Sequence, residues 1–346
     1  MTELAFKLLK EKKLSRKEYK NLISTYTQED ADVLAKEACR IRDQIYGKKV
    51  FIRGLIEISN ICKNDCYYCG IRKSNAHCVR YRLTHEEILE CCEEGYNLGF
   101  RTFVLQGGED GYYTDDILCG IVSDIKKRYP DCAVTLSLGE RTYESYLALF
   151  NEGADRYLLR HETADAEHYS RLHPQNLTLE NRMRCLNDLR DIGYQVGAGF
   201  MVGSPYQTVD HIAKDLCFIQ DFKPDMCGIG PFIPHKDTPF GDFSGGSADL
   251  TCFLLSVIRI IHPCVLLPAT TALGTVSEDG RERGILSGAN VVMPNLSPAS
   301  VRKKYQLYNN KLSDGAESAQ CLQQLKERVA LTGCEITVDR GDVKKG

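Results

Sequence analysis

The run Phe51-Ile-Arg-Gly-Leu-Ile-Glu-Ile58, followed by Cys62-Lys-Asn-Asp-Cys66-Tyr-Tyr-Cys69, decides how this 346-residue chain is interpreted. The first run is apolar and rich in β-branched residues, which predicts a buried strand. The second run is a C-x3-C-x2-C triad on the loop after that strand. Three thiolates this close together can bind three irons of a [4Fe–4S] cluster, and such clusters normally have four cysteine ligands. The triad therefore predicts a cluster whose fourth iron is open to a small molecule.

Zinc binding and simple burial are the alternatives to a cluster at this triad. Zinc prefers four ligands, usually as two C-x2-C pairs or a Cys/His mixture. Cys78 can supply a fourth thiolate only at a stretch, and no second pair follows nearby. The three residues can also be unrelated buried cysteines, because the chain contains 16 of them.

Composition excludes several classes of protein. The net charge is −3 and no long basic block occurs, which argues against nucleic-acid binding. No run approaches the ~18 apolar residues of a membrane span, and the N-terminus lacks the apolar core of a signal peptide. We therefore expect a cytoplasmic protein whose cysteines are reduced thiols, most of them packed as small hydrophobes.

Strand-like and helix-like runs alternate from Phe51 onward. Eight strands are predicted, at 51–58, 102–106, 132–138, 155–160, 195–202, 226–231, 264–269 and 289–293. Amphipathic helices are predicted between them, at 84–98, 114–128, 143–152, 178–192, 207–222, 247–262 and 279–287. This pattern predicts an α/β fold with a parallel sheet, and the count of eight favours a closed (βα)8 TIM-type barrel over an open doubly wound sheet.

The remaining parts of the chain are predicted to be helical. Residues 1–48 form an N-terminal helical extension, with Ser15 and Thr27 as helix caps. Residues 49–346 form one unit, in which helices after about residue 300 cover one end of the barrel. Thr84 and Glu87 predict a capping box at the start of the helix 84–98.

Reactive groups in such a barrel gather at the carboxyl ends of the strands. The second strand ends in Gln106-Gly-Gly-Glu109, where two glycines allow the backbone to approach a ligand closely. The fourth strand ends in Arg156, followed by Arg160 and Glu162, and Arg182 on the next helix is placed to form a bidentate pair with a carboxylate. A structural ion pair is the alternative role for these charges.

The triad on the loop after a first strand resembles the radical S-adenosylmethionine (SAM) superfamily. Further segments resemble the HydE family of that superfamily, which are maturases for the H-cluster of [FeFe]-hydrogenase. These segments are 66–75, 106–110, 156–163, 228–235, 268–275, 288–295 and Tyr305-Gln-Leu-Tyr308, and the resemblance covers roughly residues 50–310. Biotin synthase and methylornithine synthase are the nearest relatives in type.

The resemblance implies a role for each matching residue. Cys62, Cys66 and Cys69 bind the cluster, whose open iron chelates SAM. SAM contacts come from Tyr68, Gly107, Gly108, Glu109, Glu162, Arg182, Gly199 and Met201. A substrate pocket inside the barrel is lined by Arg53, Gln106, Thr135, Arg156, Thr270, Thr271, Met293, Tyr305 and Tyr308. The arginines suit an anionic substrate, because buried charge needs a partner. Tyr305 and Tyr308, three residues apart, can share a helix face, and a packing pair is the alternative.

The family also implies partners and a substrate. HydE acts on a cysteine-bound iron carbonyl–cyanide species supplied by HydG, and HydF receives the product. An external donor supplies the electron. The alternatives are a biotin synthase-like or methylornithine synthase-like enzyme, and a non-enzymatic iron–sulfur scaffold.

The sequence departs from the family pattern at two places. Ser313, Cys321 and Gln324 stand where some members have a second cysteine triad, so we predict one cluster. Tyr206 replaces a glycine in the turn after the fifth strand, which puts the geometry of that turn in doubt.

Overall fold

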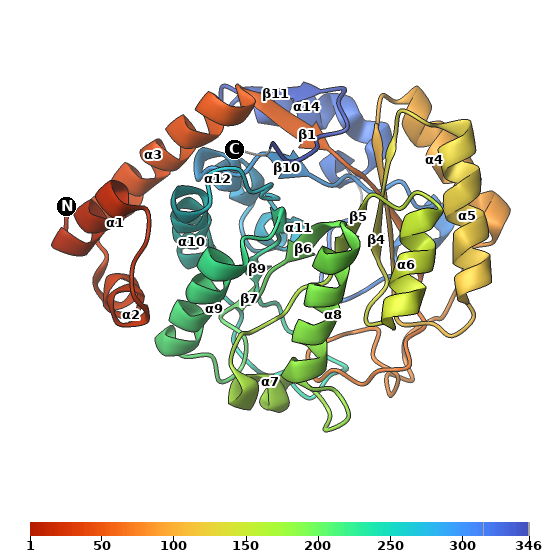
Figure 1. The fold of residues 1–346 in the computed structure, drawn as a ribbon, viewed down its shortest axis with the longest axis horizontal. Coiled ribbons are helices and arrows are strands. Elements are labelled where there is room, and N and C mark those ends of the chain that lie inside the picture. The colour runs from red at the N-terminus through yellow and green to blue at the C-terminus, as the bar shows by residue number, and fades with distance from the viewer. Residues whose placement is uncertain (314, 345–346) are drawn as a thin grey trace.

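A computed structural model describes residues 1–313 and 315–344. Six parallel strands form the main sheet, in the order β2 (Gly54–Ser59), β3 (Thr102–Gly107), β4 (Ala133–Ser137), β5 (Arg156–Leu158), β6 (Gln195–Ala198) and β8 (Met226–Cys227). The short strands β7 (Met201–Val202) and β9 (Gly230–Pro231) continue β6 and β8 and pair with each other. The predicted α/β fold with a parallel sheet is therefore confirmed (Figure 1).

Parallel pairing continues beyond the main sheet and returns to its first strand. Isolated bridges join Met226 to Leu266 and Pro268 to Val291. The strand β10 (Val291–Val292) then pairs with β1 (Lys49–Ile52), which runs into β2 through Arg53. The wall is thus a partial TIM-type barrel, with bridges in place of full ladders on one side.

The predicted seventh strand, 264–269, is the weak part of this wall. It contributes only the two bridges at Leu266 and Pro268 and no ladder. Pro268 has no amide hydrogen to donate to a neighbouring strand, which removes one bond of a possible ladder, although the amide of Ala269 still donates to Val291 at 2.9 Å. The seventh strand is therefore correctly placed but shorter than predicted.

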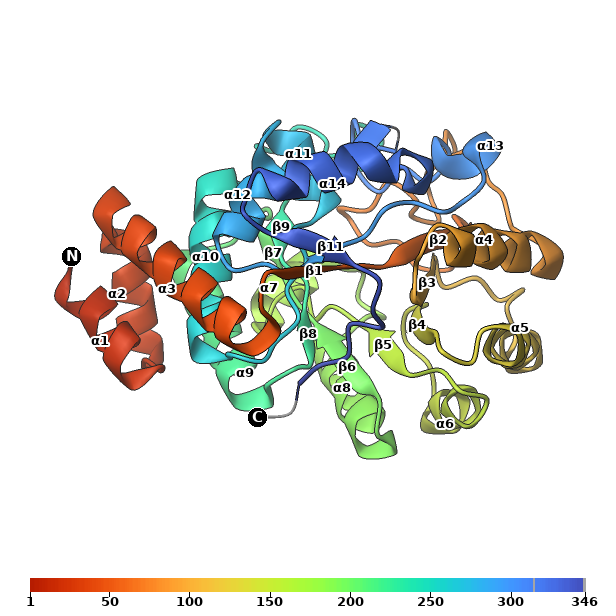
Figure 2. The same ribbon diagram turned by 90° about the horizontal axis from the view of Figure 1, so that it is seen from above.

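Seven helices lie outside the wall and connect successive strands, close to the predicted ranges (Figures 1 and 2). They are α4 (His85–Asn97), α5 (Asp115–Arg128), α6 (Tyr143–Asn151), α8 (Leu179–Ile192), α9 (Val209–Phe222), α10 (Ala248–Ile261) and α12 (Gly280–Leu286). The capping box of Thr84 and Glu87 is present. Two short helices that were not predicted, α7 (Ala166–Leu172) and α11 (Thr271–Val276), follow β5 and the seventh wall position.

The first three helices stand beside the barrel (Figure 2). They are α1 (Glu3–Glu11), α2 (Arg16–Thr25) and α3 (Gln28–Tyr46), and Ser15 and Thr27 cap the last two as predicted. The helix α2 packs against α9 and α3 packs against α10. Tyr26 stacks on Phe253, with ring centroids 3.9 Å apart, which fastens this layer to the barrel.

The segment after residue 300 differs from its predicted form. It contains α13 (Ala299–Arg302), the 3₁₀ turns η1 (Gly315–Glu317) and η2 (Ala319–Cys321), and α14 (Leu322–Ala330). It then forms a strand that was not predicted, β11 (Glu335–Thr337), parallel to β1 on the edge opposite β10. Among the described residues, no helix is long and apolar enough to cross a membrane.

Candidate active site

The cysteine triad lies at the carboxyl ends of the strands, on the loop after β2. Cys62, Cys66 and Cys69 open onto a cavity of about 310 Å³. Eleven other residues predicted for the site line the same cavity: Tyr68, Gln106, Gly107, Gly108, Glu109, Glu162, Arg182, Met201, Thr270, Tyr305 and Tyr308. We call this space the outer cavity.

The cysteine thiols are set for cluster binding rather than for free reactivity. Burial raises the pKa of Cys62 and Cys66, and raises that of Cys69 to about 12. Thiolates in such a place need the positive charge of bound iron, which a cluster supplies. Within residues 1–313 and 315–344, no three His, Cys, Asp or Glu side chains gather as ligands of a single metal ion.

The Gly107–Glu109 turn packs directly against the cysteine loop. A Cβ at Gly108 would lie 2.3 Å from the carbonyl oxygen of Ile61 and 2.7 Å from Cβ of Cys62, so only glycine fits. Glu109 Oε2 lies 3.1 Å from Nζ of Lys63, and Glu109 Oε1 accepts a hydrogen bond from the amide of Glu140 at 3.0 Å. The turn therefore fixes the edge of the outer cavity next to Cys62.

Tyr68 is held by a histidine that was not predicted. Tyr68 Oη and Nε2 of His173 are 3.1 Å apart, while Nδ1 of His173 lies 2.9 Å from the carbonyl oxygen of Tyr169. Burial lowers the pKa of His173 to about 3, so the imidazole is neutral. Nδ1–H then donates to the carbonyl and Nε2 accepts from Tyr68. Nothing in the sequence near His173 signals this contact, which depends on the position of α7.

Arg182 lines the outer cavity and is paired with Glu140, which lies outside that cavity. Arg182 donates from Nε to Oε1 of Glu140 at 2.6 Å, and both side chains are buried. Although burial opposes the charge, Tyr169 and Glu140 raise the pKa of Arg182. Arg182 thus pairs with a carboxylate, that of Glu140, but through Nε alone and not in the bidentate form that was predicted.

Glu162 and Arg160 have buried polar atoms without a hydrogen-bond partner. Arg160 Nη2 lies 3.1 Å from Oε2 of Glu162, yet neither atom has a hydrogen-bond partner of suitable geometry, and nor does Nε of Arg160. Glu162 also has a φ of +63°, a left-handed conformation that is costly for a residue with a side chain. Strain together with unsatisfied buried groups is typical of a ligand site.

Tyr305 and Tyr308 both line the outer cavity, although the helix predicted for them is absent. The helix α13 ends at Arg302, and the two tyrosines lie in the irregular segment after it. The backbone amide of Gly70 donates to the carbonyl oxygen of Leu307 at 2.8 Å, which attaches this segment to the cysteine loop. Gln106 Nε2 reaches Oη of Tyr305 at 3.5 Å.

A second, enclosed cavity of about 130 Å³ lies deeper in the barrel. We call it the inner cavity, and five predicted substrate residues line it: Arg53, Gln106, Thr135, Thr270 and Met293. Gln106, Thr270 and Arg160 line both cavities, so the two spaces adjoin. Burial, and the nearby charge of Arg156, lower the pKa of Arg53. Arg53 Nε and Nη2 and Thr135 Oγ1 have no hydrogen-bond partner among the described residues.

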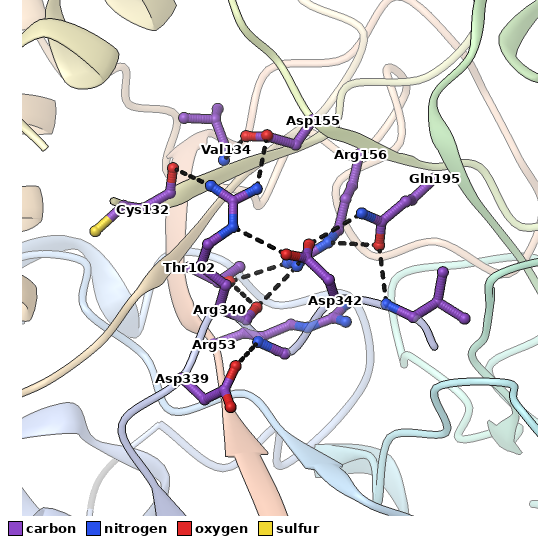
Figure 3. A network of polar contacts seen from close by, with 12 residues as sticks. Arg53, Thr102, Cys132, Val134, Asp155, Arg156, Gln195, Asp339, Arg340 and Asp342 are labelled. Carbon is purple, nitrogen blue, oxygen red and sulfur yellow. Dashed lines mark hydrogen bonds and ion pairs between the residues drawn. The ribbon is translucent and has the colours of Figure 1, made fainter. Parts of the chain in front are cut away.

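Three residues predicted for the site lie outside both cavities. Gly199 packs between strands, where a Cβ would lie 2.0 Å from the carbonyl oxygen of Gly228. Thr271 turns away and donates to Oε2 of Glu317 at 2.9 Å. Arg156 begins β5 at the amino end of the barrel and bonds to the C-terminal segment (Figure 3). Their predicted contacts with SAM or substrate are not supported by this geometry.

A buried ion pair behind the tyrosines was missed. Lys311 Nζ lies 2.7 Å from Oε1 of Glu57, and Asn295 Nδ2 donates to Oε2 of Glu57 at 2.9 Å. Lys311 also lies 5.5 Å from the ring centroid of Tyr305. Glu57 lies in the middle of an apolar strand. The one sequence signal for this ion pair is therefore a charged residue within an apolar run.

Comparison with known proteins agrees with this site. The model of the radical SAM superfamily matches residues 56–219. The chain is 42% identical to the [FeFe] hydrogenase maturase subunit HydE of Thermotoga maritima, over 97% of this chain and 96% of that protein. The chain belongs to the HydE family of radical SAM maturases. It is therefore a radical SAM enzyme of [FeFe]-hydrogenase maturation, and HydE-type chemistry implies an iron–sulfur cluster and SAM as cofactors.

Two more distant relatives of this HydE family member are methylornithine synthases. The 3-methylornithine synthase of Methanosarcina acetivorans is 28% identical over 83% of this chain and 81% of its own. A crystal structure of methylornithine synthase (PylB) superposes with a TM-score of 0.85 at 27% identity, covering 97% of both chains. The fold described above is thus shared with methylornithine synthase.

Proposed function

We propose that this enzyme holds one [4Fe–4S] cluster on Cys62, Cys66 and Cys69, binds SAM in the outer cavity, and acts on an anionic iron complex in the inner cavity. The cofactor pair supplies one-electron cleavage of SAM to methionine and a 5′-deoxyadenosyl radical. The protein supplies binding, orientation and exclusion of water. The outer cavity has the residues proposed for SAM, and the adjoining inner cavity has a cationic side chain without an ion pair among the described residues, that of Arg53.

Different residues of the outer cavity have different roles in the proposed binding of SAM. Tyr68, fixed by His173, forms an aromatic face beside the cysteines. The open carboxylate oxygen of Glu162 can accept hydrogen bonds from hydroxyl or ammonium groups of SAM. Arg182 is already paired with Glu140, so we assign it to positioning of the pocket wall.

The observation that carries the substrate proposal is Arg53. A buried guanidinium with two unpartnered atoms is costly unless a ligand completes it. Thr135 Oγ1, also without a partner, faces the same enclosed space. A small anion, such as a cyanide ligand or carboxylate of a metal complex, satisfies both groups.

The family supplies the remaining details of the proposal. The substrate is a cysteine-bound iron carbonyl–cyanide species delivered by HydG, and HydF receives the product. An external one-electron donor reduces the cluster, and the reaction takes place in the cytoplasm.

The test is anaerobic reconstitution with iron and sulfide, followed by reduction and addition of SAM. We expect an EPR signal of a reduced [4Fe–4S] cluster that SAM perturbs, and 5′-deoxyadenosine whose yield rises when the cysteine–iron complex is added. A cluster indifferent to SAM would indicate a scaffold. Turnover of lysine or dethiobiotin, with no response to the iron complex, would favour a methylornithine synthase-like or biotin synthase-like enzyme.

A further inference from the structure

Glu162, which lines the outer cavity, lies at the centre of a tight three-residue turn. The amide of Thr163 donates to the carbonyl oxygen of His161 at 2.8 Å, and the φ of Glu162 is +63°. A turn of this kind with a positive φ is rare, and it is strained for a residue with a side chain. Contacts from outside the turn are therefore needed to hold Glu162 in this conformation.

Hydrogen bonds join this turn to the segment that runs from β6 into β7. The amide of Glu162 donates to the carbonyl oxygen of Gly199 at 3.0 Å, and the amide of Met201 donates to the carbonyl oxygen of Glu162 at 3.4 Å. His161 adds a third bond, because its Nδ1 accepts from the amide of Gly199 at 3.2 Å. An Nδ1 that accepts carries no proton, so the imidazole proton of His161 is on Nε2.

Asp215 on α9 meets both ends of the turn. Its Oδ1 accepts a hydrogen bond from the amide of Ala164 at 2.5 Å and lies 3.3 Å from Nε2 of His161. Asp215 and His161 are both fully buried. The ring of His161 also packs on Phe218 of the same helix, with ring centroids 4.5 Å apart. One carboxylate oxygen thus connects the residues before and after Glu162 to a wall helix.

A contribution to stability explains this buried carboxylate poorly. Burial raises the pKa of Asp215, which means that the ionised form is costly in this place. Oδ2 of Asp215 has no hydrogen-bond partner among the described residues. Replacing buried ionic groups with well-packed apolar residues is often neutral or stabilising. A positional role, in which Oδ1 sets the path of the turn, accounts for an arrangement that gains little stability.

We propose that Asp215 is a positioning residue for SAM binding, which holds Glu162 in the left-handed conformation that presents its carboxylate to the outer cavity. It acts through the imidazole of His161 and the amide of Ala164. Neither Asp215 nor His161 lines that cavity, so both can affect SAM only through the turn. This inference rests on the proposed function, because it assumes that the open carboxylate oxygen of Glu162 binds SAM.

The experiment measures the dissociation constant of SAM by anaerobic equilibrium dialysis of the reconstituted enzyme. Asp215→Leu removes the shared acceptor and should raise this constant about tenfold, the effect of losing one hydrogen bond to a charged group. Asp215→Asn keeps an accepting Oδ1 and should stay within about twofold of the unmodified enzyme. Asp210→Asn is the matched control on α9, because its ion pair with Arg16 is at the surface, and it should have no effect.

A double-mutant cycle separates positioning from a general loss of packing. Glu162→Ala removes the carboxylate and should itself raise the dissociation constant of SAM about tenfold. Adding Asp215→Leu to Glu162→Ala should change nothing further, because Asp215 acts through that carboxylate. A second loss of about tenfold in the double variant would mean that Asp215 affects SAM by another route, which overturns the inference.

The remaining outcomes separate this inference from the proposed function. Unaltered SAM affinity in Asp215→Leu, together with impaired affinity in Glu162→Ala, overturns the inference about Asp215 while the proposed function stands. Unaltered affinity in Glu162→Ala overturns the assignment of Glu162 to SAM and the inference with it. If Asp215→Leu does not fold, His161→Phe keeps a ring but removes the acceptor for Gly199, and it should give the same loss and the same cycle. Unaltered affinity in His161→Phe would then overturn the inference.

Discussion

Arg156 at the amino end of the barrel uses all three guanidinium nitrogens in hydrogen bonds, whereas Arg160 at the carboxyl end leaves Nε without a partner. The two arginines belong to the same short stretch after α6. Leaving a buried polar group unsatisfied costs about 1–3 kcal/mol, so the carboxyl end is less stable than it could be. The amino end is built for closure, and the carboxyl end keeps unsatisfied groups that a ligand completes.

Removal of the cysteine ligands should have the largest effect, all of it at the carboxyl end. Cys62→Ala, Cys66→Ala or Cys69→Ala should abolish formation of 5′-deoxyadenosine, because each substitution deprives one iron of the cluster of its only protein ligand. The assay is nucleoside production with iron content and EPR. Cys78→Ala, on the same loop, is the control and should keep cluster and activity. Normal cleavage by any triad variant would show that the cluster is held elsewhere.

The next effect concerns stability, at the buried ion pair between Arg182 and Glu140. Breaking this pair should lower the free energy of unfolding more than breaking an exposed ion pair does. Arg182→Met leaves Glu140 buried without its partner, which we expect to lower the free energy of unfolding by about 3–5 kcal/mol in urea titrations. Arg184→Met, two residues along α8, removes an ion pair of a half-exposed side chain and should cost about 1 kcal/mol or less. Equal losses would mean that burial of the Arg182 pair contributes nothing.

Two threonines on adjacent strands test the comparison directly. Thr102→Val removes the hydroxyl between Arg156 and the carbonyl oxygen of Arg340, and should lower the free energy of unfolding by about 1–3 kcal/mol without changing SAM cleavage. Thr135→Val deletes a hydroxyl that has no partner, so stability should be unchanged or slightly higher. The substrate response of Thr135→Val should fall instead. The reverse pattern would contradict the division between the two ends.

The pH dependence of stability should report on His173 at the carboxyl end. Burial lowers its pKa to about 3, so the unfolded chain takes up a proton below pH ~6.5 while the folded protein does not. The contribution of His173 to the free energy of unfolding is therefore complete above pH ~6.5. It falls by about 1.4 kcal/mol per pH unit as the pH decreases toward 3. His173→Gln should remove that slope from urea titrations between pH 7 and 5. His77→Gln, an exposed histidine, controls for loss of an imidazole.

The smallest effect is expected at Tyr206, on the rim of the carboxyl end. Its φ of +65° costs about 1–2 kcal/mol, and its ring contact with Arg171 returns about 0.5–1 kcal/mol. Tyr206→Gly should therefore raise the free energy of unfolding by about 1 kcal/mol or less, measured as a small rise in Tm. A fall in Tm would show that packing of Tyr206 on Phe240 and Phe243 outweighs the strain.

The sequence predicted those features that depend on local pattern. The strand 51–58, the triad and the Gly107–Glu109 turn each carry their signal within a few residues. The structure has all three in place, but it divides the strand at Arg53 into β1 and β2. The wall helices follow for the same reason, since each has its own apolar face and cap.

The missed features depend on residues far apart in the sequence. Arg156 and Asp342 are separated by 186 positions, so nothing near Arg156 indicates that it belongs to the barrel closure. His173 holds Tyr68 from 105 positions away. The segment Tyr305-Gln-Leu-Tyr308 is irregular and is attached to Gly70 by a backbone hydrogen bond. A spacing of three residues between the tyrosines does not distinguish a helix from a segment held by such tertiary contacts.

The position of β1 has a consequence for how the protein is made. Its two partners, β10 and β11, are synthesised long after it, so β1 emerges from the ribosome with both edges unpaired. The cysteine loop follows β1 by only ten residues and is complete early in translation. A nascent chain therefore presents its cysteines in an unclosed barrel, and closure of the wall waits for residues 291–342.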